Sequence, residues 1–192
     1  MSNTSALFNE NFEKERKYEV LGGVQYMAPP PSTAHSQSSG NSYSIFRNYF
    51  KGTKCRVFIE HNLFLSEKDH LIPDVMVVCN AEIIQFDGIY GTPNLIVEVL
   101  SPSTSVRDRG YKKDLYEKHK VVEYWLIDPK NRIVSVYLLV DDKYKLDNEY
   151  YIPEEWELKR MTDVEKEKVQ YTFKTHLSED LIIDIRDVFE NV

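Results

Sequence analysis

The sequence predicts one domain of the α/β or α+β class, and three observations support this. Two apolar runs, LIPDVMVVC at 71–79 and NLIVEVLSPST at 94–104, have the length and composition of buried strands. A stretch from about 106 to 119 places its apolar residues along one side of a helix. A strand at 121–127, a turn at 128–131 and a return strand at 132–140 follow, and 144–146 extend this meander.

The first third of the chain predicts a hairpin, a helix and a strand. Apolar residues flank Gly22-Gly23 between Tyr18 and Met27, and two glycines supply the positive φ of a tight turn. Three prolines at 29–31 make a stiff connector, after which Ser32 or Thr33 can cap a helix that runs to about Phe50. One strand from Arg56 to Leu65 follows.

The remaining segments are the two ends of the chain and a highly charged stretch near the C-terminus. Residues 1–16 are polar, so we expect them to be frayed or loosely helical. Residues 153–168, PEEWELKRMTDVEKEK, are so charged that they predict an exposed helix or excursion. Leu181 to Val192 predicts a short strand and a terminal turn. No repeat or long linker divides the chain, so 1–192 is predicted to be a single domain.

Composition narrows the classes of function. The chain has 192 residues, 42% hydrophobic and 29% charged, as in ordinary globular proteins. It has no apolar run of membrane-spanning length and no signal-peptide core at its start, so we expect a cytoplasmic protein. The formal net charge of −7 counts against a strong non-specific DNA binder, although it permits a local basic patch. Cys55 and Cys79 form no CxxC motif, and we expect buried, reduced thiols.

Each of the two apolar runs carries one carboxylate. Asp74 follows Pro73 at the head of the first run, and Glu98 lies in the middle of the second. An unpaired carboxylate in a buried strand costs several kcal/mol or takes up a proton. Three explanations compete: each acid pairs with a basic side chain, each is protonated, or the two share a cation. For either acid alone, a turn cap at Asp74 and a buried ion pair at Glu98 are the simpler readings.

The helix predicted after Glu98 adds a basic group. At 100° per residue, Asp108, Lys112, Leu115 and His119 fall within one narrow arc, with two tyrosines beside it, whereas Lys113 falls on the opposite arc. Lys112 is therefore expected to face inward. Such a lysine either neutralises the two carboxylates or takes part in catalysis with them.

These residues resemble the PD-(D/E)XK nuclease pattern and, more closely, the bacterial Uma-two family of restriction endonucleases. Four pieces carry the resemblance, from about Tyr18 to Phe189: YEVLGGVQYMAPPPSTAH at 18–35, PDVMVVC at 73–79, PNLIVEVLSPST at 93–104 and DRGYKKDLYEKHKVVEYWLIDP at 108–129. The resemblance implies a restriction-endonuclease-like fold, in which helices flank a mixed central β-sheet. It also implies an Mg²⁺-dependent endonuclease that hydrolyses the phosphodiester bonds of DNA.

The resemblance assigns roles to these residues with one departure. The superfamily lysine stands two residues after the second acid, where this chain has Leu100; the family implies that the lysine has moved to Lys112. Asp74, Glu98 and Lys112 are then the catalytic residues. Asp74, Glu98 and the backbone carbonyl of Val99 are the ligands of Mg²⁺, for which Mn²⁺ is a possible substitute.

Secondary candidates each have a simpler interpretation. Glu19 could reach the cleft or be an exposed hairpin residue, and His35 could do so or be a polar group at the helix start. Asp108 could be the acid of a capping box that begins at Ser105, and Tyr116 could hold a ligand or merely pack. The histidines show no zinc-binding spacing. Arg107, Arg109 and Lys113 would form a basic rim or an ordinary solvated face.

Two other functions remain open at this point. The first is a non-catalytic binding or regulatory module with the same fold, which the acidic charge and the absent motif lysine favour. The second is a different phosphate or metal enzyme, for example a nuclease directed at RNA, although the chain carries no RNA-recognition motif. The expected partner is DNA, with no membrane partner, and a homodimer is expected if both strands of a duplex are cut.

Overall fold

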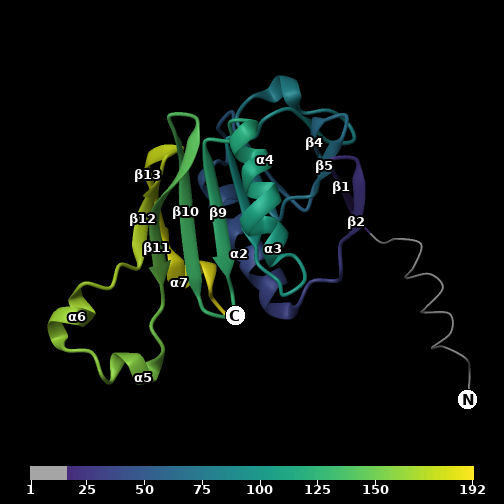
Figure 1. Ribbon diagram of the computed structural model, residues 1–192. Coiled ribbons are helices and arrows are strands. Elements are labelled where there is room, and N and C mark those ends of the chain that lie inside the picture. The colour runs from purple at the N-terminus through teal and green to yellow at the C-terminus, as the bar shows by residue number, and fades with distance from the viewer. Residues whose placement is uncertain (1–16) are drawn as a thin grey trace, which may run out of the picture.

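The computed structural model describes residues 17–192, so the expectation for residues 1–16 lies outside the described residues. A six-stranded sheet forms the centre of the molecule (Figure 1). Its strands, in spatial order, are β11 (Lys143–Tyr151), β10 (Ile133–Val140), β9 (Glu123–Asp128), β8 (Leu95–Val99), β6 (Val75–Val78) and β3 (Arg56–Ile59). The sheet is mixed, because β8 and β9 run parallel while their neighbours pair antiparallel.

Two smaller sheets and several helices cover this sheet. A five-stranded sheet contains, in spatial order, β2 (Val24–Met27), β1 (Tyr18–Leu21), β5 (Asp69–Leu71), β4 (Leu63–Ser66) and β7 (Ile89–Tyr90). β12 (Thr172–Thr175) and β13 (Ser178–Asp184) form a hairpin. The helices are α2 (Thr33–Tyr49), the 3₁₀ turn η1 (Ala81–Ile83), α3 (Ser105–Arg107), the π-helix η2 (Asp108–Lys112), α4 (Lys113–Lys118), α5 (Glu155–Leu158), α6 (Asp163–Glu167) and α7 (Ile185–Val188).

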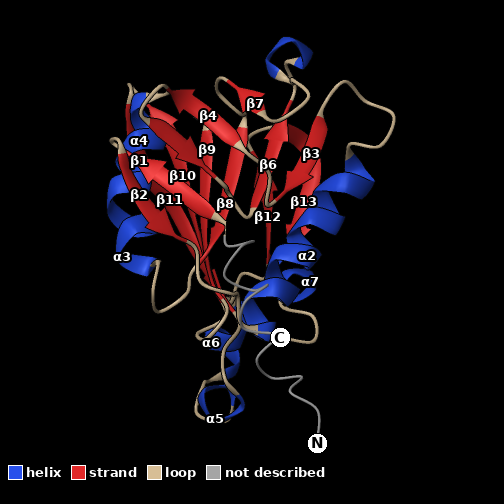
Figure 2. Cartoon of the chain, turned by 90° about the vertical axis from the view of Figure 1, so that its right-hand side faces the viewer, coloured by secondary structure: helices blue, strands red, loops and turns tan. Residues whose placement is uncertain are grey.

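The six-stranded sheet has a hydrophobic core on each face. Alternating residues of β6 and β8 supply both cores, which is why these strands are apolar at nearly every position. One core, around Trp125 and Phe46, lies against α2, α7 and the β12–β13 hairpin. The other, around Tyr116 and Leu126, lies against α4 and the five-stranded sheet. Figure 2 shows the strands between α2 and α7 on one side and α3 and α4 on the other.

Local sequence explains the elements that the prediction placed correctly. Gly22 and Gly23 adopt φ of +61° and +83° in the turn of the β1–β2 hairpin, as predicted. Ser32 caps α2 by accepting a hydrogen bond from the amide of His35 at 3.2 Å. The charged segment forms α5 and α6, which project from the body of the molecule (Figures 1 and 2). The prediction of an exposed excursion is therefore confirmed.

Four local predictions are wrong. The single strand from Arg56 to Leu65 is two strands in different sheets, because Glu60 adopts φ of +44° and ends β3. No capping box forms at Ser105, since Thr104 precedes the helix and its side chain makes no capping bond. The terminal strand begins earlier, at Ser178, and pairs with the unpredicted β12. The terminal turn is the short helix α7.

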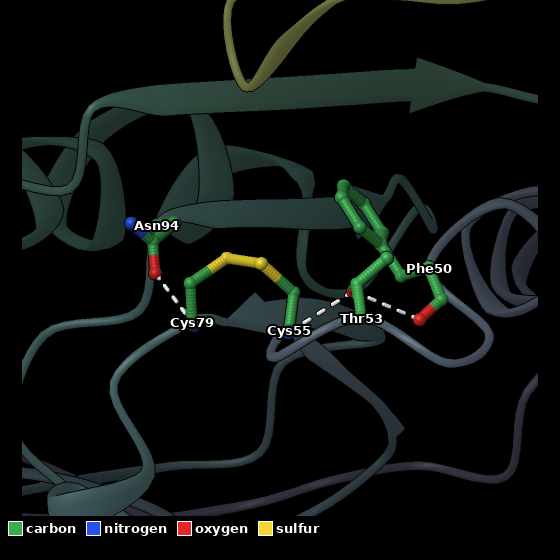
Figure 3. The surroundings of a disulfide bond; sticks show 5 residues. All are labelled: Phe50, Thr53, Cys55, Cys79 and Asn94. Atoms are coloured by element: carbon green, nitrogen blue, oxygen red, sulfur yellow. Dashed lines mark hydrogen bonds between the residues drawn. A yellow bond between two sulfur atoms is a disulfide. The ribbon is translucent and has the colours of Figure 1, made fainter.

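The prediction for the cysteines is also wrong. Cys55 and Cys79 are partly buried and form a disulfide (Figure 3). The antiparallel register pairs Arg56 with Val78, so the next residues outward, the two cysteines, lie opposite each other. Cysteines 24 positions apart in sequence are thus brought together by strand pairing, which their spacing could not reveal.

Candidate active site

Asp74 and Glu98 lie on the same face of the central sheet. The register of β6 and β8 pairs Val75 with Val97, and extending it by one residue places Asp74 opposite Glu98. Side chains alternate along a strand, so both acids lie on the face of the sheet that carries Met76. The Trp125 core lies on the opposite face. The backbone amide of Val99 donates a 2.7 Å hydrogen bond to Asp74 Oδ2. Strand pairing therefore brings the two predicted acids together.

The segment from α3 to α4 brings a lysine and a tyrosine to Glu98. Lys112 Nζ lies 3.1 Å and the Tyr116 hydroxyl 2.6 Å from Glu98 Oε1. Lys112 is at the end of the π-helix η2, and single π turns within α-helices are often found at functional sites. Lys113 lies instead over the ring of Tyr137, at 3.9 Å from its centroid. The prediction that Lys112 is the inward-facing lysine is confirmed.

Glu19 and His35 reach the same place from two other elements. Glu19 is an inward residue of β1, and its Oε1 lies 2.8 Å from Lys112 Nζ, so the interpretation of an exposed hairpin residue is wrong. His35, in the first turn of α2, places Nε2 at 3.4 Å from Asp74 Oδ2. Asp108 Oδ1 lies 3.5 Å from Lys112 Nζ, so this acid is an ion-pair partner and does not cap the helix.

All seven side chains that the sequence singled out are thus close together. We call them the buried polar cluster: Glu19, His35, Asp74, Glu98, Asp108, Lys112 and Tyr116. None of these residues, taken whole, is more than 9% exposed. Val99, whose carbonyl was the remaining candidate, is buried at the end of β8 beside Asp74.

The protonation of the cluster follows from burial and charge. Burial raises the pKa of Glu98 well above its usual range, and the attraction of Lys112 does not cancel this effect. Burial likewise raises the pKa of Asp108. Burial alone would lower the pKa of Lys112, but the neighbouring carboxylates outweigh it and raise that pKa instead. The lysine is therefore a permanent cation within the site.

Asp74 also raises the pKa of His35. Burial alone would lower the pKa of His35, but the hydrogen bond and charge of Asp74 reverse this and raise it. Four carboxylates and one ammonium give the cluster a formal charge of −3 when His35 is neutral and −2 when it is protonated. With all four carboxyls ionised, this excess of buried negative charge is relieved either by protonation, which the raised pKa of Glu98 and of Asp108 favours, or by a bound cation.

The donor atoms fit a hard divalent cation. Both hydrogen bonds to Glu98 end on Oε1, and the bond from Val99 to Asp74 ends on Oδ2. Among the described residues, no donor reaches the other two oxygens, Asp74 Oδ1 and Glu98 Oε2. Within residues 17–192 no group of three or more His, Cys, Asp or Glu side chains is arranged as a metal site. Two carboxylates nevertheless suffice for Mg²⁺, which keeps several waters.

Two features of the site were missed from the sequence. Ser38, Ser39 and Ser42 are buried on the same face of α2 as His35, at positions i+3, i+4 and i+7. This polar helical face was a readable signal, because small polar residues rarely occupy a buried face by chance. The Tyr124 hydroxyl donates to the backbone carbonyl of Asp108 at 2.9 Å, a contact that only the tertiary structure reveals.

The predicted basic rim is dispersed among other contacts. Arg107 lies over the ring of Tyr26, with 4.9 Å to the centroid. Arg109 lies 3.9 Å from Asp128 and keeps half of its side chain exposed. Arg109 is thus the member of the rim that remains most available to a phosphate.

Comparison with known proteins identifies the family. A family model described as "Putative restriction endonuclease" and named Uma2 matches residues 6–165. The chain belongs to this family. An uncharacterized protein of Synechocystis sp. is 30% identical over 151 residues, which cover 77% of this chain and 80% of the relative. The family predicted from the sequence is therefore confirmed, and membership supports a nuclease.

A solved structure shows the fold. The crystal structure described as "a putative nuclease belonging to DUF820" from Anabaena variabilis superposes with a TM-score of 0.70. The match has 21% sequence identity and covers 94% of this chain and 96% of the other. The predicted restriction-endonuclease-like architecture, with mixed sheets flanked by helices, is confirmed. Among residues 17–192 the structure contains no helix with the length and apolarity needed to cross a membrane.

Proposed function

We propose that this Uma2-family chain is a metal-dependent endonuclease that hydrolyses phosphodiester bonds of DNA. The observation that carries the proposal is the convergence of Asp74, Glu98 and Lys112 in one buried cluster with excess negative charge. Family membership supports the nuclease class. The combination of two carboxylates and a lysine suits phosphodiester hydrolysis, which needs a cation site and a fixed positive charge.

Asp74, Glu98 and the carbonyl of Val99 would hold Mg²⁺, or Mn²⁺ in its place. When bound, such a cation supplies a water of lowered pKa and stabilises negative charge on the phosphate. The Val99 amide orients Asp74, and the Tyr116 hydroxyl orients Glu98. These contacts hold both carboxylates in place before any substrate arrives.

Lys112 is the catalytic cation of this proposal. Its ammonium group is fixed by carboxylates and its raised pKa keeps it charged, so it can offset the charge that develops on the scissile phosphate. Because its side chain is only 4% exposed, the low local dielectric strengthens this interaction. The remaining functional groups act by positioning: His35 contacts Asp74, while Glu19 and Asp108 contact Lys112.

Nicking of supercoiled plasmid with Mg²⁺ or Mn²⁺ tests the proposal. We expect wild type to cut and Asp74→Asn, Glu98→Gln and Lys112→Ala each to lose at least about a hundredfold in rate. Asp114→Asn, an exposed acid on α4, is the matched control and should cut like wild type. Circular dichroism verifies that each variant is folded. An inert wild type, or folded site variants with full activity, would contradict the mechanism.

A non-catalytic binding module is the second candidate. The net charge of −7 favours it because it disfavours the approach of a nucleic acid. The contacts of Lys112 and Tyr116 with Glu98 also favour it, because they already occupy one oxygen of a proposed metal ligand. Titration with Mg²⁺ and Mn²⁺ separates the two functions. A cation that binds the folded state raises the melting temperature, and a melting temperature insensitive to both ions would favour the module.

The remaining partner assignments are part of the same proposal. Cleavage of both strands of a duplex would be matched by a homodimer with two-fold symmetry. Sedimentation equilibrium on the full chain measures this state, and a monomer at all concentrations would limit the enzyme to single-strand nicks. The cytoplasmic location predicted from the sequence also stays a prediction.

A further inference from the structure

The four carboxylates of the buried polar cluster divide into two pairs. Asp74 and Glu98 each direct one oxygen to protein donors, and in the described chain their other oxygens, Oδ1 and Oε2, receive no hydrogen bond. Glu19 and Asp108 each direct an oxygen at Lys112, as Glu98 does, but they come from β1 and η2 and not from the paired strands of the central sheet. The first pair therefore lies side by side on the central sheet with one oxygen each left for a cation, whereas the second pair approaches the ammonium group from other elements.

Glu19 connects Lys112 to the segment that carries Asp74. Its Oε1 accepts a hydrogen bond from the amide of Ile72 at 3.0 Å and lies 2.8 Å from Lys112 Nζ. Ile72 precedes Asp74 by two residues. One carboxylate oxygen thus fixes Lys112 relative to the segment that leads through Asp74 into β6.

Asp108 holds the lysine from the other direction. Its backbone carbonyl accepts the hydroxyl of Tyr124 at 2.9 Å, which anchors the residue to β9. Its side chain is 2% exposed, and Oδ1 has no hydrogen-bond partner among the described residues. The Lys112 ammonium at 3.5 Å is the positive charge that compensates this oxygen.

We infer that Glu19 and Asp108 are positioning residues that hold Lys112 and are not ligands of the divalent cation that Asp74 and Glu98 would bind. This inference rests on the proposed function. One divalent cation compensates the first pair of carboxylates, while the second pair already has the ammonium group and the Ile72 amide. Glu98 would bind the cation through Oε2, and Glu19 and Asp108 would hold Lys112 whatever Glu98 binds.

Calorimetric titration of the full chain with Mn²⁺ tests the assignment without reference to activity. We expect wild type, Glu19→Gln and Asp108→Asn to bind one ion per chain, with affinities that differ by less than about tenfold. Asp74→Asn and Glu98→Gln should lose more than about tenfold in affinity, because each removes a ligand charge. The two positioning variants are independent of each other, so either one that folds by circular dichroism suffices.

The rate of plasmid cleavage at saturating Mn²⁺ provides the second readout. Glu19→Gln should lower kcat by about tenfold to a hundredfold with little change in ion affinity, because a lysine displaced by an ångström loses its effect on the transition state. Asp114→Asn removes an exposed carboxylate of α4, the helix that follows Lys112. This control should change neither quantity.

The outcomes separate this inference from the proposed function. Two ions per wild-type chain, reduced to one in Glu19→Gln, would make Glu19 a ligand and overturn the inference while the nuclease stands. A folded Glu19→Gln variant with full kcat would overturn the positioning role. No Mn²⁺ binding by wild type would overturn both the inference and the metal dependence.

Discussion

Lys112 shows how a single residue can be both a structural and a chemical requirement. Its ammonium group contacts three buried carboxylates, and only 4% of its side chain is exposed. We expect Lys112→Met to lower the free energy of unfolding by about 3–5 kcal/mol in the presence of chelator, because it leaves those charges uncompensated. Urea unfolding followed by circular dichroism measures the loss.

Lys113→Met is the matched control for that prediction. Lys113 is the next residue and lies over the ring of Tyr137, and a cation–π contact of this kind is worth about 1 kcal/mol or less, so its loss should cost less than about 1 kcal/mol. Added Mg²⁺ should recover part of the stability of Lys112→Met, since a cation then serves the same carboxylates. Equal losses in the two variants would mean that the buried ion pairs contribute nothing particular to stability.

Glu123 gives a pH-dependent prediction away from the site. Burial raises the pKa of this carboxyl above its ordinary value of 4.5, and hydrogen bonds from the Trp125 indole and the His176 amide only partly offset burial. The folded chain therefore binds the Glu123 proton more tightly than the unfolded chain does. This contribution to stability is fully present below about pH 4.5 and is lost as the pH rises through the folded-state pKa.

Glu123→Gln removes that dependence. As the pH rises above 4.5, the free energy of unfolding of wild type should fall relative to that of the variant. Urea unfolding of both proteins over a series of pH values measures the difference, which cancels the titration of all other groups. A difference that stays constant over the series would show that the Glu123 proton is not linked to folding.

The site residues could be found in advance where local periodicity determined them. The helical period separated Lys112 from Lys113, and the apolar runs around Asp74 and Glu98 showed that both acids are buried. The same approach left Glu19 and His35 with two interpretations each. Their burial depends on the packing of β1 and α2 against elements that are far away in the sequence. The local sequence pattern of one segment cannot predict such contacts.

At the scale of elements, the disulfide is the main feature that the sequence concealed. Its cysteines flank β3 and β6, and β3 is the edge strand of the central sheet. Hydrogen bonds from the Cys79 amide to Asn94 and from the Cys55 amide to Thr53 hold both ends of the bridge (Figure 3). The bridge therefore fastens an exposed edge of the sheet to its interior.

Loss of the bridge should destabilise the chain. For a closed loop set by a separation of 24 residues, we expect Cys55→Ser/Cys79→Ser to lower the free energy of unfolding by about 3 kcal/mol. Reduced wild type should match this variant in urea unfolding, and the variant should not respond to reductant. If oxidised and reduced wild type unfold at the same urea concentration, the bridge does not contribute to stability.

The predicted boundaries of elements were wrong where an unusual backbone conformation determined them. The left-handed φ of Glu60 splits a predicted strand between two sheets, and nothing in the apolar pattern of 56–65 indicates that break. The π turn at 108–112 was equally hidden, because a π turn and an α turn place residues i and i+4 on nearly the same face. The arc therefore identified Lys112 correctly, although it assumed α-helical geometry for a segment that is a π-helix.

At the scale of the whole molecule, the net charge of −7 opposes the approach of DNA to a site that is itself acidic. Binding must then depend on a few local cations and on the metal. Arg109 is the clearest candidate among the predicted rim, because it is in η2 between two cluster residues and half of its side chain is exposed. Long-range attraction is absent, so the number of phosphates contacted by basic residues should be small.

The salt dependence of DNA binding measures that number. The slope of log K against log salt is about −0.9 for each phosphate neutralised, so Arg109→Gln should make the slope less negative by about 1. Fluorescence anisotropy with a labelled duplex, over a range of KCl concentrations and in Ca²⁺ to prevent cleavage, gives both slopes. Lys159→Gln is the control, since Lys159 is equally charged and 71% exposed but lies in the projecting segment. Equal changes in both variants would mean that the molecule binds DNA through its general surface, and the phosphate contact assigned to Arg109 would be wrong.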